Sequence, residues 1–143
     1  MGARSRKSEP LSVRLDETTM TFVRHEAQRT RRSRGAIVEA LTEEAARLRR
    51  FPGIAFRGDD AERRAWVIGT GLDVWEIIEL RGDHESDEAL LDAHPSVDAR
   101  ALRLAAAYYA SYADEIDSAI VANHMPTGEL IAAYPFISIV RDE

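Results

Sequence analysis

The chain has 143 residues, enough for one ordinary domain or two small ones. Its hydrophobic content of 45% is normal for a folded protein, so the composition excludes a chain that is disordered throughout. It contains no cysteine, which excludes disulfide frameworks and thiolate metal sites and favours a cytoplasmic protein. No apolar run approaches the roughly 18–20 residues that span a membrane, so we expect no membrane partner.

The net charge of −6 conceals two parts of opposite sign. Residues 1–50 carry 12 basic and 7 acidic side chains, whereas residues 51–143 carry 7 basic and 18 acidic ones. This asymmetry indicates two modules with different partners, unless the charges are uneven by chance.

The first ten residues are polar and basic. We expect residues 1–10 to form a flexible arm whose Arg4, Arg6 and Lys7 reach DNA phosphates, the alternative being an inert start.

Apolar and polar residues alternate from Leu11 to Asp16, which predicts a short strand. A lone strand is unstable, and no partner strand follows nearby. The simplest partner is the same strand of a second copy, paired antiparallel about a two-fold axis. Such a two-stranded ribbon fits the DNA major groove and would present Ser12 and Arg14 twice.

Two helices should follow this strand. Asp16 is a good N-cap for a helix over residues 17–29, and Ser33 for a second helix ending near Arg50. Phe22 lies off the apolar stripe of the first helix and is left for another surface. The amides at the start of the second helix would suit a DNA phosphate, although a plain cap explains Ser33 equally well.

Residues 11–50 resemble a ribbon–helix–helix domain, the DNA-binding half of many repressors and antitoxins. The matching pieces are Leu-Ser-Val-Arg-Leu at 11–15 and Ala-Gln-Arg-Thr-Arg-Arg-Ser-Arg at 27–34. The resemblance implies base reading by Ser12 and Arg14 and phosphate contacts by Ser33 and Arg34. It departs from the family at Arg31, where a glycine is usual. Arginine adopts the left-handed conformation only at some cost, so we expect a turn of different shape.

Residues 51–123 read as a second unit. Phe51-Pro52-Gly53 ends the preceding helix, and two short strands at 54–57 and 65–68 flank a polar loop. Helices capped by Asp73, Ser86 and Asp98 follow, and Asp114 restarts a last helix that ends near Asn123. The spacing of a short helix, a tight turn and a longer helix is that of a helix-turn-helix, but three-helix cores without DNA share it.

This second unit is similar to a small domain family, once of unknown function, that is found in VapB-type antitoxins. The matching pieces are residues 51–54, 68–78, 88–95 and 102–116. The resemblance implies that this unit has a winged helix-turn-helix shape. It also implies that the protein is encoded beside a toxin related to PIN-domain ribonucleases. The acidic side chains at 87, 88, 92 and 98 argue against DNA contact by this unit, because phosphates repel them.

The tail, residues 124–143, contains the apolar run from Leu130 to Val140, which is too apolar to be left in water. It either folds back on its own domain or is a toxin-docking segment that orders on binding. For the second reading the candidate contacts are Leu130, Ile131, Tyr134, Phe136, Ile137 and Ile139.

Enzyme chemistry has little support, because the four histidines lack metal-ligand spacing and no glycine-rich phosphate loop precedes a helix. We therefore expect no catalytic residue, metal or cofactor. The predicted fold is mainly α, a dimeric ribbon–helix–helix domain followed by a winged helix-turn-helix-like domain with a short hairpin. The predicted function is an antitoxin that represses its operon by binding operator DNA as a dimer and neutralises a PIN-like ribonuclease, either as that dimer or in a higher oligomer with the toxin. The alternative is a stand-alone repressor whose second domain senses a ligand or oligomerises.

Overall fold

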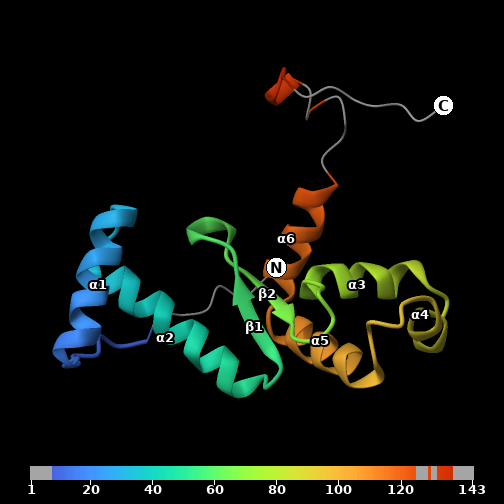
Figure 1. Ribbon diagram of the computed structural model, residues 1–143, viewed down its shortest axis with the longest axis horizontal. Coiled ribbons are helices and arrows are strands. Elements are labelled where there is room, and N and C mark those ends of the chain that lie inside the picture. The colour runs from blue at the N-terminus through green and yellow to red at the C-terminus, as the bar shows by residue number, and fades with distance from the viewer. Residues whose placement is uncertain (1–7, 125–128, 130–131, 137–143) are drawn as a thin grey trace. The chain divides into compact units, whose positions relative to one another are not determined.

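The computed structural model describes residues 8–124, 129 and 132–136, and the chain divides into two compact units, residues 1–73 and 74–143. The described residues are mainly helical, with six α-helices and one two-stranded sheet (Figure 1). Over this part of the chain, no helix is both long enough and apolar enough to cross a membrane.

The first unit begins with two helices, α1 from Glu17 to Thr30 and α2 from Arg34 to Arg50, which confirms the two predicted helices. The carboxylate of Asp16 caps α1 by accepting a hydrogen bond from the Thr19 amide at 2.7 Å. These helices pack on each other but bury little, because Val23 is the buried residue of α1 and Ile37 that of α2.

An antiparallel hairpin completes the first unit, with β1 from Ile54 to Arg57 and β2 from Arg64 to Val67. These bounds agree with the predicted strands to within one residue. The connection holds a short 3-10 helix, η1, at Asp60–Glu62. It needs glycine at position 58, where φ is +92° and a Cβ atom would collide with the carbonyl oxygen of Glu62.

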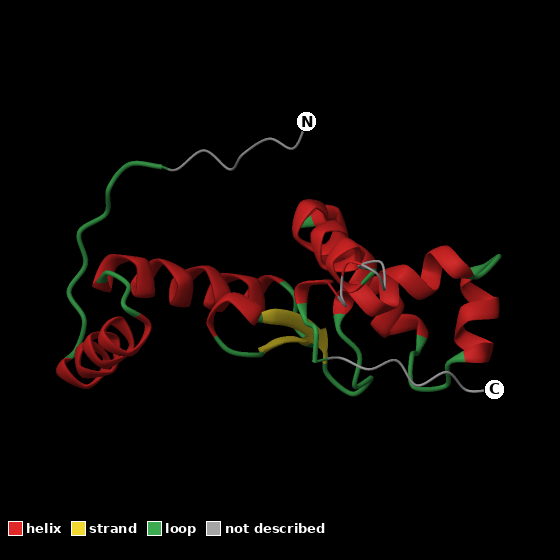
Figure 2. Cartoon of the chain, turned by 90° about the horizontal axis from the view of Figure 1, so that it is seen from above, coloured by secondary structure: helices red, strands yellow, loops and turns green. Residues whose placement is uncertain are grey.

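The predicted N-terminal ribbon is wrong. Residues 8–16 form no strand and appear as a loop before α1 (Figure 2), and the sheet lies after the two helices instead. The alternation from Leu11 to Leu15 is a pattern of side chains, and a strand also needs a hydrogen-bonding partner. Nothing in the described chain supplies one, since β1 pairs with β2. Leu11 is 85% exposed and Val13 54%.

The second unit contains four helices: α3 from Val74 to Asp83, α4 from Asp87 to Ala93, α5 from Ala99 to Ser111 and α6 from Ala113 to Asn123. Helix α3 packs on each of the other three, and the fully buried side chains of this unit include Ile77 of α3, Leu90 of α4 and Tyr108 of α5. The predicted winged helix-turn-helix is a further error, because contacts group the hairpin with α1 and α2 and not with these four helices.

We expect Ile77→Ala to lower the free energy of unfolding by about 2–5 kcal/mol, because it leaves a cavity in a fully buried position. The matched control is Ile68→Ala, at a side chain that is 57% exposed, which should change it by less than about 0.5 kcal/mol. Urea unfolding followed by circular dichroism measures both, and equal losses would contradict the assigned core.

Candidate nucleic-acid interface and an adjoining groove

The turn between α1 and α2 is closed by backbone hydrogen bonds around Arg31. This residue has φ 55° and ψ 39°, the left-handed conformation, and ends α1 as its C-cap. The Arg32 amide donates to the carbonyl of Ala27 at 3.1 Å, the wide bond of a Schellman-type turn. The turn therefore forms with arginine at the position where ribbon–helix–helix domains usually have glycine. A left-handed backbone conformation costs arginine more conformational free energy than it costs glycine.

Ser33 begins α2 as predicted. Its Oγ accepts a hydrogen bond from the Ala36 amide at 3.1 Å, and its side chain is exposed. The first turn of α2 contains no acidic side chain. Helix α4 offers the opposite case, since Ser86 caps it with the same 3.1 Å bond while Asp87 and Glu88 occupy its first turn. Of the described helices, α2 and α5 have no acidic side chain in the first turn, and α5 is capped by the carboxylate of Asp98, whereas α2 is capped by the neutral Ser33.

Arginines of the first unit fall into two groups. Those of the first group make ion pairs with carboxylates: Arg24 with Glu17, Arg29 with Glu26 and Asp60, Arg63 with Glu44, and both Arg57 and Arg64 with Asp73. The second group, whose members are exposed and pair with no carboxylate of the described chain, comprises Arg14, Arg49 and the three turn residues Arg31, Arg32 and Arg34. Three of these five unpaired arginines therefore lie within four residues of one another at the start of α2.

The other predicted DNA contacts are less well placed. Ser12 and Arg14 are exposed in the irregular segment before α1, so their roles in base reading stay predictions without a ribbon to orient them. Arg4, Arg6 and Lys7 lie outside the described residues. Sequence reasoning did not single out Arg31 and Arg32 as DNA contacts, although four arginines among residues 29–34 were a visible signal.

Two of the predicted toxin contacts are described. Tyr134 is 46% exposed and Phe136 is 83% exposed, and their rings meet edge to face with centroids 6.0 Å apart. Leu130, Ile131, Ile137 and Ile139 lie outside the described residues. The described part of the tail thus presents an aromatic pair to solvent.

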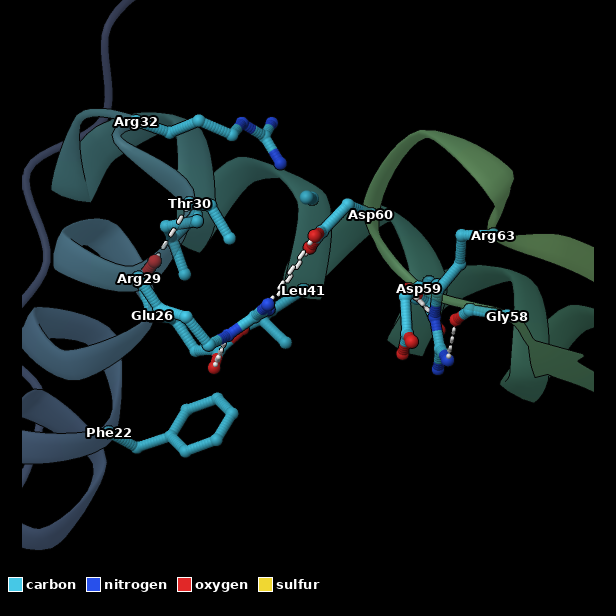
Figure 3. Close-up of a pocket in the computed structure, with 13 residues that line it drawn as sticks. Phe22, Glu26, Arg29, Thr30, Arg32, Leu41, Gly58, Asp59, Asp60 and Arg63 are labelled. Atoms are coloured by element: carbon cyan, nitrogen blue, oxygen red, sulfur yellow. Dashed lines mark hydrogen bonds and ion pairs between the residues drawn. The ribbon is translucent and has the colours of Figure 1, made fainter.

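A groove of about 540 Å³ lies between α1, α2 and the 58–63 loop (Figure 3). Its apolar lining comes from Phe22, Ile37, Ala40 and Leu41. Phe22 is 50% exposed and Leu41 41%, so both keep much of their surface in solvent. Phe22, which the sequence left without a place in the core, therefore belongs to this groove.

Ion pairs cross this groove from the helices to the loop. Arg29 holds Glu26 through two hydrogen bonds of 2.8 and 3.0 Å and also reaches Asp60 at 3.0 Å, as Figure 3 shows. Arg63 binds Glu44 at 2.8 Å. The hydrogen bond from Arg29 lowers the pKa of Glu26, and the bond to Glu44 raises the pKa of Arg63. Arg32 also lines the groove, and Figure 3 shows its side chain extending over it.

The loop is held in place by a buried carboxylate that the sequence analysis treated only as a helix cap. Asp73 is 4% exposed. One of its oxygens accepts from Arg57 on β1 at 2.7 Å, and the other accepts from Arg64 on β2 at 2.6 Å. Asp73 therefore joins both strands of the hairpin whose connection forms one wall of the groove.

We expect Glu26→Gln to make the first unit less sensitive to acid. The folded pKa of Glu26 lies below its ordinary value of 4.5, so its contribution to stability is complete above that pH and is lost as the pH falls through the folded pKa. The variant should be less stable than the wild type at pH 7 and should lose less stability between about pH 5 and 3. Urea midpoints over this range test this, with Glu43→Gln, an exposed glutamate of α2, as the control. Parallel pH curves for wild type and Glu26→Gln would refute it.

Residues 61–109 match a family described as a protein of unknown function, DUF433. The matched segment takes in β2, α3, α4 and most of α5, and leaves out the turn between α1 and α2. Comparisons with curated proteins and with solved structures give no significant match.

Proposed function

We propose that this protein is an antitoxin that binds operator DNA as a homodimer through its first unit and neutralises a partner ribonuclease through its second unit and tail. The observation that carries the DNA half is the group of exposed, unpaired arginines at the start of α2. Five other arginines of the first unit are neutralised by a carboxylate, whereas this group is not and is available to an anion from outside the chain.

DNA phosphates fit the chemistry of this turn. The first amides of α2 and its helix dipole favour an anion, and Arg31 and Arg34 add positive charge on either side of the Ser33 cap. Contacts of this kind fix the position of a protein on DNA without reading sequence. Binding through them weakens as salt rises, because counterions are released from the DNA.

The charges of the two units support this division of labour. Residues 1–73 carry 15 basic and 11 acidic side chains, a net charge of +4, and residues 74–143 carry 4 basic and 14 acidic ones, a net charge of −10. The first unit attracts a polyanion and the second repels it. An acidic surface instead complements a nuclease, whose own surface must attract RNA.

Tyr134 and Phe136 supply the apolar part of the nuclease contact in this proposal. Both rings are exposed, and exposed aromatic side chains are typical anchors of protein interfaces. The acidic unit then speeds the encounter, and the tail slows dissociation. Both partners of such a regulator, operator DNA and a ribonuclease toxin, are found in the cytoplasm.

We expect Arg34→Ala to weaken binding to specific and random duplexes alike and to reduce the slope of log affinity against log salt by about 1, because it removes a phosphate contact. Arg100→Ala is the matched control, since Arg100 is also an exposed arginine in the first turn of a capped helix, α5. Fluorescence anisotropy over a salt series measures both. An unchanged slope for Arg34→Ala would contradict the interface.

A second pair of variants separates the cap from the anion site. Ser33→Ala and Ser86→Ala each remove a 3.1 Å capping bond and should each cost about 1 kcal/mol of stability. Only Ser33→Ala should also weaken DNA binding. Equal DNA binding by the two variants would show that α2 does not receive a phosphate.

We expect removal of residues 126–143 to leave DNA binding intact and to speed dissociation of the nuclease encoded by the adjacent gene, since the apolar anchor is lost. Surface plasmon resonance with that nuclease and the full chain, the truncated chain and Phe136→Ala measures this. An unchanged dissociation rate for the truncated chain would remove the tail from the contact and leave the acidic unit as its site.

A further inference from the structure

The groove between α1, α2 and the 58–63 loop is unfilled in the single chain. Helices of 14 and 17 residues that bury only Val23 and Ile37 gain little from packing on each other, and isolated helices of this length are marginal in water. Covering Phe22 and Leu41 would add apolar burial where the two helices lack it.

The chain also carries an exposed apolar segment without a place to pack. Leu11 and Val13 lie two residues apart just before α1, and they are 85% and 54% exposed. In an extended backbone, residues at this spacing point to the same side. The segment is described and lies outside the groove, so the chain does not fill its own groove with it.

We propose that the groove receives residues 9–13 of a second copy of this chain. Leu11 and Val13 of one copy lie over Phe22 and Leu41 of the other, and the exchange is reciprocal about a two-fold axis. The contact requires no pairing of strands. This contact is the dimer interface of the homodimer in the proposed function, on which this inference rests, and it forms whether or not DNA is bound.

Charge is compatible with this occupant. The pairs Arg29–Asp60 and Arg63–Glu44 neutralise the walls of the groove, so two copies of a unit with net positive charge do not repel each other there. The cation left over is Arg32, which extends over the groove (Figure 3) and pairs with no carboxylate of the described chain. The arriving segment brings Glu9, an exposed carboxylate two residues before Leu11, which is suited to pair with it.

A second copy also satisfies the closure that symmetry demands. Each chain carries one segment and one groove, so a two-fold exchange fills both grooves and leaves no open end, whereas a one-way contact would lead to a chain of copies.

The absence of cysteine from the sequence allows a direct test by cross-linking. Full-length Val13→Cys and Leu41→Cys variants, one of them enlarged by a fusion tag, are mixed without DNA and oxidised. We expect a disulfide between the large and the small chain. The control mixes Val121→Cys, at an apolar residue of α6 that is 73% exposed, with Leu41→Cys and should give no such product.

Sedimentation tests the energetics with a matched pair of variants. Leu41 and Leu48 are both on α2 and both 41% exposed, but only Leu41 lines the groove. Leu41→Asp should raise the dimer dissociation constant about tenfold or more, because it puts a charge into an apolar contact, and Leu48→Asp should leave it nearly unchanged. Circular dichroism confirms that both remain folded.

Three results would overturn the proposal: a monomer at every concentration, a dimer that gives no Val13–Leu41 cross-link, or, in a chain that carries both Val13→Cys and Leu41→Cys, a disulfide that forms within that one chain. None of these measurements contains DNA. They therefore fail or succeed independently of the proposed operator binding.

Discussion

The buried carboxylate of Asp73 is the constraint on which the arrangement of the first unit depends. It binds Arg57 on one strand and Arg64 on the other, so the hairpin cannot shift without breaking a hydrogen bond to a nearly inaccessible anion. Replacing both arginines would remove the cations that pair with this buried carboxylate, which is costly. The hairpin held in this way carries the loop with Asp60 and Arg63 to the two helices.

Ion pairs with this loop neutralise some charged side chains of α1 and α2 and leave others free to bind a partner. Asp60 and Arg63 engage Arg29 and Glu44, and together they form a neutral wall along the groove. These pairs are solvent-exposed, so each adds little to stability, and their main effect is to position the loop. The arginines of the turn have no such partner. The same network thus produces both a neutral groove and a positive helix end, two surfaces that suit different partners.

Parts of this arrangement follow from local sequence rules and parts do not. The bounds of α1 and α2 were predicted because Asp16 and Ser33 are strong caps, and the hairpin because Gly53 and the 58–64 loop punctuate two short apolar runs. The ribbon was wrong because the alternation from Leu11 to Leu15 specifies a face and not a hydrogen-bonding partner. The groove could not be predicted from the sequence, because the Arg29–Asp60 pair joins residues 31 positions apart and the Arg63–Glu44 pair joins residues 19 positions apart. No periodicity in one sequence encodes such pairs.

The central claim is that DNA meets the chain at the start of α2. The most direct test is to record the amide chemical shifts of the full chain while a short duplex is added at low salt. We predict that the largest changes fall on Arg31 to Ala36, whose amides and side chains would surround a phosphate, and that residues 83–92 of the acidic unit stay unchanged. Changes that are largest in the acidic unit, or absent from the start of α2 at saturating duplex, would contradict the account.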